Sequence, residues 1–215
     1  YFEGEIAYDH YAYFLRQLLV PILPPSGVLW MLRAALMACL LAHAGSAFHL
    51  WARNKKARGS DKYAVKKSSA EYFASRYAMR TMRWSGVFLL FFIVWHILQF
   101  TTLTIAPSGH SQHGRPYMNL YYDFQLWWVY LIYLVALASL CLHLWHGVWS
   151  ALQTLGATRG NTIPFIRLIA FVVAFGLFIA FMCVPTAILF GWVPEPMSAA
   201  DYAVKAAEAG IVLSH

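Results

Sequence analysis

Three histidines lie inside long apolar stretches of the sequence, where a polar side chain needs a partner. His43 occurs in ACLLAHAGSAF, His143 in SLCLHLWHGVW and His96 in FFIVWHILQF. Imidazole is a standard axial ligand of haem iron, and a six-coordinate iron takes one ligand from each side. A lone membrane histidine can instead form an interhelical hydrogen bond worth about 1 kcal/mol. The depth of each histidine in the membrane and the residues beside it are needed to distinguish haem ligation from a hydrogen bond.

The composition places these stretches in a bilayer. Hydrophobic residues make up 60% of the chain and charged residues only 12%, whereas soluble domains are about a quarter charged. A helix needs roughly 20 apolar residues to cross a ~30 Å hydrocarbon core. Four runs are at least 23 residues long: 28–50, 84–106, 126–152 and 168–193. We therefore predict an all-α fold, a polytopic transmembrane helix bundle with four spanning helices in this chain.

Lys and Arg indicate the orientation of the bundle, because positively charged short loops stay on the cytoplasmic side. Ten of the sixteen basic residues lie from Arg53 to Arg83, which predicts a cytoplasmic basic loop over residues 51–83. Residues 1–27 and 107–125 are then external loops. The net charge of +7 is explained by this topology and by anionic lipid, and requires no nucleic acid.

The ends of the chain and its remaining histidines carry weaker signals. Residues 1–27 are predicted to lie outside although no translocation signal precedes them, so we expect a further helix before this sequence and five helices in the parent bundle. Residues 194–215 form an external tail that is expected to contain a short helix. Three cysteines do not make a disulfide framework in a membrane chain.

The remaining histidines are expected to lie outside the hydrocarbon core. We expect His10, His110 and His113 to be solvated in the external loops, and His49 to be interfacial at the cytoplasmic helix end.

Depth divides the three membrane histidines into two levels. At 1.5 Å per residue, His43 lies roughly 10 Å and His143 roughly 14 Å from the cytoplasmic ends of their runs. His96 lies roughly 18 Å from the cytoplasmic end of its run, nearer the outer side. The first two histidines are therefore candidates for one shared site.

Small residues flank both members of that pair. One polar, small-residue stripe of the helix 126–152 contains Ser139, His143, His146, Gly147 and Ser150. On the helix 28–50, a similar face contains Ala35, Ala42, His43 and Ser46. Two histidines at matched depth beside residues that leave space for a flat macrocycle favour haem ligation over a simple hydrogen bond.

Three segments together resemble a known family. The runs GVLWMLRAALMACLLAHAGSAF, FASRYAMRTMRWSGVFLLFFIVWHILQF and HLWHGVWSALQTLG resemble the single-chain cytochrome b membrane anchor of succinate dehydrogenase (respiratory complex II), the five-helix form with two b haems. The similarity extends over residues 8–193. It is most specific at His143, Gly147 and Trp149 and at the Ser-Arg pair that precedes His96.

The resemblance implies how the histidines pair. In that family four histidines on the first four helices bind the haems, and helix one pairs with helix three and helix two with helix four. His43 and His143 would then bind the haem nearer the cytoplasm, the pair that depth alone selects. His96 would bind a distal haem together with a histidine on a helix that this sequence lacks. As given, the chain completes only one of the two haem sites.

The resemblance also implies a role in the tricarboxylic acid cycle and in respiratory electron transport. A flavoprotein subunit would oxidise succinate and an iron-sulfur subunit would relay the electrons. This anchor would dock both subunits and deliver the electrons to a membrane quinone, in a bacterial cytoplasmic (inner) membrane. The membrane runs contain no carboxylate pair, flavin site or oxyanion hole, so no catalytic residue is assigned to this chain.

Basic residues near the cytoplasmic boundary are further candidates. Arg76, Arg80 and Arg83 are placed to bind haem propionates or a quinone oxygen, since a cation at a low-dielectric boundary favours an anionic partner. His146 is placed to donate to the same acceptor. Ordinary interfacial cations are the alternative interpretation.

Two other interpretations stay open at this point. Cys39 and Cys141 lie near His43 and His143, and two thiolates with two imidazoles are the ligands of a Rieske-type [2Fe–2S] centre. Residues 141 and 143, however, point about 200° apart on a helix. A non-redox transporter or structural membrane protein would instead use the histidines for hydrogen bonds or proton transfer, and a haem-free anchor would keep only the quinone site.

Overall fold

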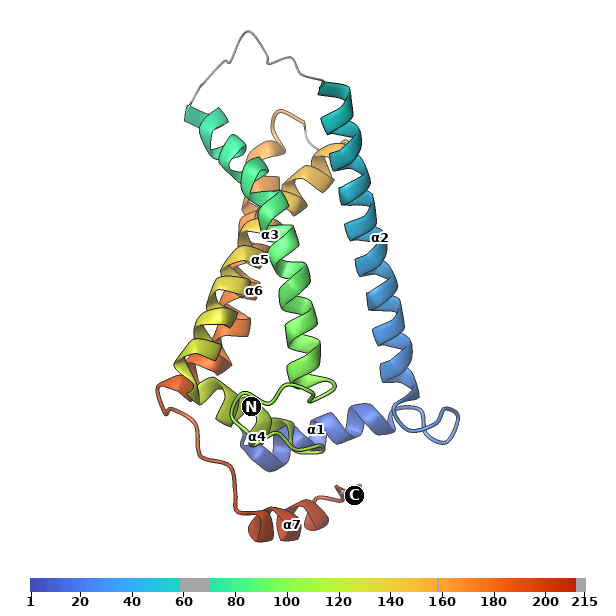
Figure 1. Ribbon diagram of the computed structural model, residues 1–215, viewed down its shortest axis with the longest axis vertical. Helices are drawn as coiled ribbons and strands as arrows, with labels where there is room; N and C mark the ends of the chain where they lie inside the picture. Colours follow the sequence, from blue (N-terminus) through green and yellow to red (C-terminus); the bar gives the residue numbers. More distant parts are fainter. Residues whose placement is uncertain (59–69, 158, 212–215) are drawn as a thin grey trace. The chain divides into compact units, whose positions relative to one another are not determined.

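The computed structural model describes residues 1–58, 70–157 and 159–211, with only the backbone described for residues 58 and 70–80. All regular secondary structure in these residues is α-helical (Figure 1). The helices in chain order are α1 (Glu5–Gln17), α2 (Gly27–Arg58), α3 (Ala70–Phe100), α4 (Pro116–Gln125), α5 (Trp127–Thr154), α6 (Ile163–Leu189) and α7 (Ala199–Glu208). The predicted all-α class is confirmed.

Four of these helices are long and apolar enough to cross a membrane. Their spanning segments are Gly27–Ala57, Thr81–Phe100, Trp127–Thr154 and Ile163–Leu189. Each corresponds to one of the four runs that hydropathy predicts, so the chain is a membrane protein with a helical bundle. The short helix predicted in the tail is also present, as α7.

Several helix boundaries differ from the prediction. α2 continues to Arg58 instead of ending at residue 50, and α3 begins at Ala70, so parts of the predicted loop 51–83 are helical. α3 ends at Phe100 rather than at 106. The chain leaves the helix through Leu103, which has a positive φ of 54°, and the Ile105 amide donates back to the Leu98 carbonyl at 3.2 Å. Thr101, Thr102 and Thr104 are β-branched residues of low helix propensity, and hydropathy does not detect such a helix end.

α6 is shifted toward the N-terminus relative to the predicted 168–193, and it spans Ile163–Leu189. A proline in the first turn suits a helix start. The predicted run begins directly after Arg167, whose guanidinium lies over the Trp149 ring on α5, 5.2 Å from the ring centroid. A cation–π contact of this kind lets a helix carry an arginine at the membrane boundary.

The chain divides into two compact units: residues 1–10 with 74–215, and residues 11–73. In the first unit, α5 and α6 pack along each other and α4 contacts both. Ala170 and Ala174, one turn apart on α6, are fully buried, and small residues of this kind let membrane helices approach closely. A buried cluster joins α4, the N-terminal part of α5 and the C-terminal end of α6: Tyr121, Phe124, Val129, Tyr133, Ala187, Ile188 and Val193.

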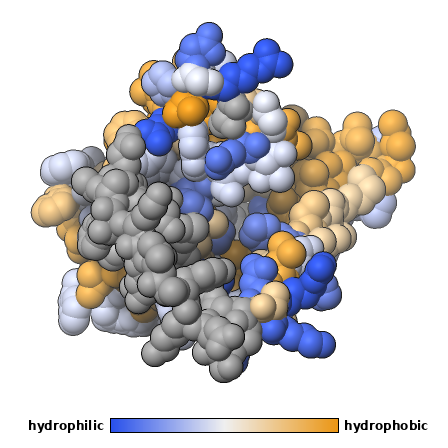
Figure 2. All heavy atoms as spheres, turned by 90° about the horizontal axis from the view of Figure 1, so that it is seen from above, coloured by the Kyte–Doolittle hydropathy of each residue, from blue (hydrophilic) through white to orange (hydrophobic). Residues whose placement is uncertain are grey.

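The second unit consists mainly of α2. Within this unit, the most apolar part of the helix has no buried residues. Its C-terminal end is basic, with Arg53, Lys55 and Lys56 exposed. Figure 2 views the structure from above relative to Figure 1 and shows both hydrophilic and hydrophobic atoms on this face.

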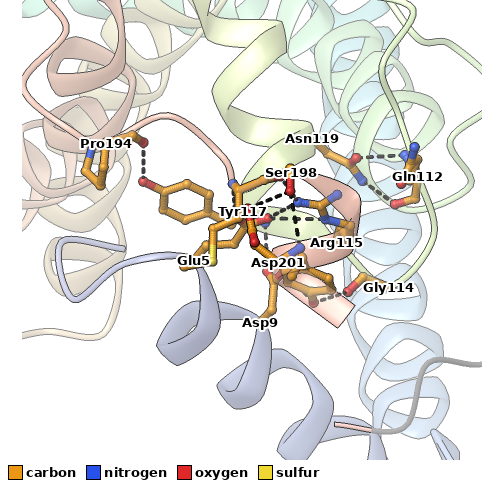
Figure 3. Close-up of polar contacts among 12 residues, drawn as sticks. Glu5, Asp9, Gln112, Gly114, Arg115, Tyr117, Asn119, Pro194, Ser198 and Asp201 are labelled. Carbon is orange, nitrogen blue, oxygen red and sulfur yellow. Dashed lines mark hydrogen bonds and ion pairs between the residues drawn. The ribbon is translucent and has the colours of Figure 1, made fainter. Parts of the chain in front are cut away.

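On the opposite side of the predicted membrane, two segments expected to be loops form the helices α1 and α4. A buried ion pair joins them: Arg115 donates to Glu5 Oε1 through Nη2 at 2.6 Å and through Nε at 3.2 Å. The same Nη2 donates to the Met197 carbonyl at 3.0 Å, and the Met197 amide donates to Glu5 Oε2 at 2.6 Å. The loop before α4, the start of α1 and the tail are thus tied together (Figure 3).

Asp9 makes a second set of contacts in the same place. Its carboxylate accepts a hydrogen bond from the Tyr117 amide in the first turn of α4 at 2.9 Å, and another from the Tyr202 hydroxyl of α7 at 3.0 Å. The Asp9 residue is only 1% exposed. Burial raises the pKa of Asp9 to about 6, although both hydrogen bonds act in the opposite direction.

Candidate functional site

One face of α3 brings polar side chains toward α5. Ser85 and His96 are eleven residues apart, close to three full helical turns, so they share a face about 16 Å apart along the axis. Gln99 lies one turn beyond His96 on the same side and is fully buried. The helix α5 is antiparallel to α3 and supplies Tyr133 and His143 to this face.

The outer level is centred on His96. Its Nδ1 lies 3.1 Å from the Tyr133 hydroxyl oxygen. That hydroxyl donates its only proton to Gln99 Oε1 at 3.0 Å, so it is available to His96 only as an acceptor. His96 Nδ1 must therefore carry the proton, and Nε2 holds the lone pair of the neutral ring. This is the tautomer that binds a metal through Nε2.

The orientation of the Gln99 amide is fixed by its other contacts. The Trp95 indole, which is a donor only, donates to Gln99 Oε1 at 2.8 Å. The amide nitrogen Nε2 donates to Asp123 Oδ2 at 2.7 Å. The second oxygen of Asp123 accepts from the Ser108 amide at 3.2 Å. A continuous chain of hydrogen bonds thus runs from a buried carboxylate to the His96 ring.

Aromatic rings surround His96 and complete this level. The rings of Phe92, Phe100 and Tyr133 have centroids 6.1, 5.7 and 6.0 Å from that of His96. The Tyr133 ring packs edge-on against Phe92 at 4.9 Å. His96 itself is an exposed residue within an apolar span, which is a costly position for an imidazole unless another group covers it.

The inner level is centred on His143. Its Nδ1 lies 3.3 Å from the Ser85 hydroxyl oxygen, and that hydroxyl donates to the Met82 carbonyl at 3.0 Å. The Ser85 oxygen is then an acceptor toward the ring, which favours the tautomer with the proton on Nδ1 and the lone pair on Nε2. Gly86 lies beside the same ring, and a Cβ at this position would be 3.4 Å from His143 Cε1.

A glycine lies near each histidine of the predicted inner pair, on the helix of that histidine. A Cβ at Gly147, one turn from His143, would meet no described atom within 4 Å, and the same holds for Gly45 beside His43. His146 and Gly147 are half-buried, as are Ser139 and Ser150. The predicted stripe therefore lies partly covered and partly open, which suits a haem edge.

The His43 pairing joins the two units and stays a prediction. His43 and Cys39 lie on α2 and are exposed within the second unit. Counted along each helix, His43 is 14 residues from the C-terminal end of its span and His143 is 11 residues from the C-terminal end of its own, and both ends are predicted to be cytoplasmic. Both are deeper than the apolar runs suggest, at about 21 and 17 Å, and they stay at similar depth.

The other predicted residues are placed as follows. Arg83 is exposed close to the start of its span, whereas the side chains of Arg76 and Arg80 lie outside the described residues. His49 is exposed near the basic end of α2. The histidines predicted to be solvated are all exposed outside the spans: His10, His110 and His113.

The cluster alternative uses residues from both units, so it also stays a prediction. Cys141 is buried on α5, and helical rotation places it about 200° from His143, which contacts α3. Within the described residues, no three or more His, Cys, Asp or Glu side chains gather as a metal site. A haem with two axial histidines needs no such group.

Sequence reasoning missed the partners of the histidines. Tyr133, Gln99 and Asp123 hold His96, and Ser85 holds His143. A signal was present in part: Gln99 follows His96 by three residues and Ser85 precedes it by eleven, so all three share a helical face. The contributions of Tyr133 and Asp123 depend on how α3, α4 and α5 meet, which the spacing does not reveal.

A comparison with protein-family models, with curated proteins and with solved structures found no match to this chain.

Proposed function

We propose that this chain is the cytochrome b membrane-anchor subunit of succinate:quinone oxidoreductase, which passes electrons from an iron-sulfur subunit to a membrane quinone through b-type haem. The observation that carries the proposal is the shared geometry of His96 and His143. In each case the imidazole Nδ1 contacts a hydroxyl group, Ser85 or Tyr133, and that hydroxyl donates its hydrogen bond to a carbonyl oxygen. Metal-binding histidines are typically held in this way, through the nitrogen that does not bind the metal.

The residues present fit two haems at two levels. His143 and His43 would hold the inner haem, and Gly86 lies directly against the His143 ring, where a Cβ would be 3.4 Å from Cε1. His96 would hold the outer haem, together with a histidine that the family pattern places on a further helix. Bound haem supplies reversible one-electron transfer. The roles left to the chain are to orient the imidazoles, to exclude water with the apolar spans, and to bind anionic groups at the cytoplasmic boundary.

The basic segment from Arg53 to Arg83 supports docking of the partner subunits. Its charge suits an acidic protein surface or anionic lipid, and Arg76, Arg80 and Arg83 suit the haem propionates or a quinone oxygen. Succinate oxidation would take place on the flavoprotein subunit. The location that follows is a bacterial cytoplasmic (inner) membrane, with the basic segment inside.

Histidine and cysteine variants test the proposal. His43→Ala and His143→Ala should abolish the same haem signal, because both rings would bind one iron, while His96→Ala should remove only a second signal. Cys39→Ser and Cys141→Ser should leave the optical spectrum of both haems near that of the wild type. A rhombic iron-sulfur resonance that disappears in either Cys variant, in a chain without a Soret band, would establish the Rieske-type alternative instead.

A chain without any redox centre would contradict both the haem proposal and the Rieske-type alternative. In that case the histidines would serve a transporter or a structural membrane protein. Proton-transfer assays of His96→Ala and His143→Ala in vesicles would then distinguish these two roles.

A further inference from the structure

We infer that Tyr133, Gln99 and Asp123 are positioning residues for His96, because they fix the proton on Nδ1 and make Nε2 the electron-rich ligand nitrogen. The inference about the proton rests on geometry alone. Its consequence for electron transfer rests on the proposed function, because it takes Nε2 as a haem ligand.

The assignment follows from counting protons along the chain of hydrogen bonds. Asp123 accepts from the Gln99 amide nitrogen, so the Gln99 oxygen must face Tyr133. Tyr133 donates to that oxygen and has no second proton to give. The contact of 3.1 Å between Tyr133 and His96 is therefore a hydrogen bond only when His96 Nδ1 is the donor. Each link determines the polarity of the next.

Burial stabilises this direction of the hydrogen bonds from His96 through Tyr133 and Gln99 to Asp123. Gln99 and Asp123 are both 0% exposed, and Tyr133 belongs to the buried cluster between α4, α5 and α6. In such surroundings an unmade hydrogen bond costs about 1–3 kcal/mol, so reversing one amide or hydroxyl would leave several groups unsatisfied. Chains of hydrogen bonds in a low-dielectric interior also polarise one another.

The expected consequence is a more basic Nε2. A hydrogen bond from Nδ1 moves electron density into the ring, and a ligand of higher basicity stabilises the oxidised iron. The Tyr133 contact should therefore lower the midpoint potential of the outer haem. His143 has a similar contact with Ser85, but the structure shows no buried carboxylate behind that hydroxyl among its described contacts. The outer chain of hydrogen bonds ends at Asp123, whereas the described contact of Ser85 ends at the Met82 carbonyl.

The test uses the assembled oxidoreductase in lipid nanodiscs, where the further helix of the family pattern would complete the outer haem site, with ¹⁵N-labelled histidine and dithionite reduction. Tyr133→Phe removes the acceptor and keeps the ring. Tyr130→Phe is the matched control, because Tyr130 is on the same helix and its hydroxyl contacts Thr186 Oγ1 at 3.3 Å, on α6. His96→Gln identifies the His96 signal. The measurements are the Nδ1–H proton signal and the midpoint potential of each haem.

The inference predicts a downfield, hydrogen-bonded Nδ1–H for His96 in the wild type, which moves upfield or disappears in Tyr133→Phe and is unchanged in Tyr130→Phe. The reduction equilibrium of the outer haem should shift about tenfold toward the reduced form in Tyr133→Phe, which is ~59 mV for one electron. Asp123→Asn should shift it in the same direction by a smaller factor, and the inner haem should keep its potential in all three variants.

Three results would overturn the inference: a wild-type His96 protonated on Nε2, a Tyr133→Phe variant with an unchanged Nδ1–H signal, or equal changes in Tyr130→Phe. A preparation without haem would instead contradict the proposed function. The Nδ1–H signal would still decide the inference in that case, so the two failures are distinguishable.

Discussion

Ser85 Oγ on α3 lies 3.3 Å from His143 Nδ1 on α5, although the two residues are 58 positions apart in the chain. The Ser85 hydroxyl gives its proton to the Met82 carbonyl one turn earlier. The Ser85 oxygen can therefore accept a hydrogen bond from the imidazole Nδ1–H, which orients the ring. This contact defines the inner level of the bundle as the Tyr133 contact defines the outer level.

Ser85→Ala should weaken the orientation of His143. A neutral hydrogen bond is worth about 1 kcal/mol, which corresponds to a change of roughly fivefold in an equilibrium constant. Redox titration should show a shift of this size toward the reduced form in the inner haem only. Ser85→Thr retains the hydroxyl and should restore the wild-type value. A Thr variant that behaves like Ala would show that packing, and not the hydroxyl, is responsible.

Gly86 should tolerate Ala but not Leu. A Cβ at Gly86 would be 3.4 Å from His143 Cε1, a distance that one methyl group can occupy. The longer Leu side chain would push the ring away from Ser85, so the inner haem should be lost or reduced in occupancy while the outer haem remains. Optical spectra at two poised potentials measure both. Gly176→Leu on α6 is the control, since its Cβ would meet no described atom within 4 Å.

The spans themselves were predictable from hydropathy, because a bilayer demands long apolar helices whatever their packing. Their ends were not. Six residues after Phe100 are apolar or threonine-rich enough to extend the run, yet the backbone turns at Leu103. The predicted run starts after Arg167, whereas α6 includes this residue and its guanidinium lies over the Trp149 ring. Local backbone geometry and a contact between two helices decide these ends.

The candidate site was predictable only in its histidines. Periodicity places Ser85, His96 and Gln99 on one face, but it cannot show that Tyr133 and Asp123 approach that face from other helices. The ion pair of Glu5 with Arg115 joins residues 110 positions apart, and no local pattern marks either residue as a partner of the other. Such contacts depend on tertiary structure.

The contacts of Asp9 with α4 and α7 should make the stability of the protein depend on pH. Its pKa is about 6 in the folded protein, raised from 3.8 by burial. The protonated form is thus favoured in the fold, and its stabilisation is fully present below pH 3.8 and is lost as the pH rises through 6. This shift corresponds to at most about 3 kcal/mol. Thermal unfolding in detergent between pH 4 and pH 7 should show the decline.

Asp9→Asn isolates this contribution. The amide oxygen can accept from the Tyr117 amide as the carboxylate does, and the side chain has no charge to desolvate. Relative to the wild type, the variant should be more stable at pH 7 and similar at pH 4. A constant difference across this pH range would contradict the assignment to Asp9.

Arg115→Gln should release the external tail. It leaves Glu5 buried without its cation, and breaking a buried ion pair costs about 3–5 kcal/mol. Limited proteolysis should then cut residues 190–198 faster, and the melting temperature should fall. The double variant Glu5→Gln with Arg115→Gln should recover part of this loss. Lys205→Gln, an exposed change on α7, is the control and should resemble the wild type in both measurements.

The reduced-minus-oxidised visible spectrum of the purified wild-type chain tests the central claim most directly. Axial histidine ligation at both levels predicts a Soret band and sharp b-type bands on dithionite reduction, with at least the inner haem present. Addition of a reduced quinone should produce the same bands. A chain that is folded, as judged by its helical circular dichroism, and that shows no haem absorption before or after reduction would contradict the account.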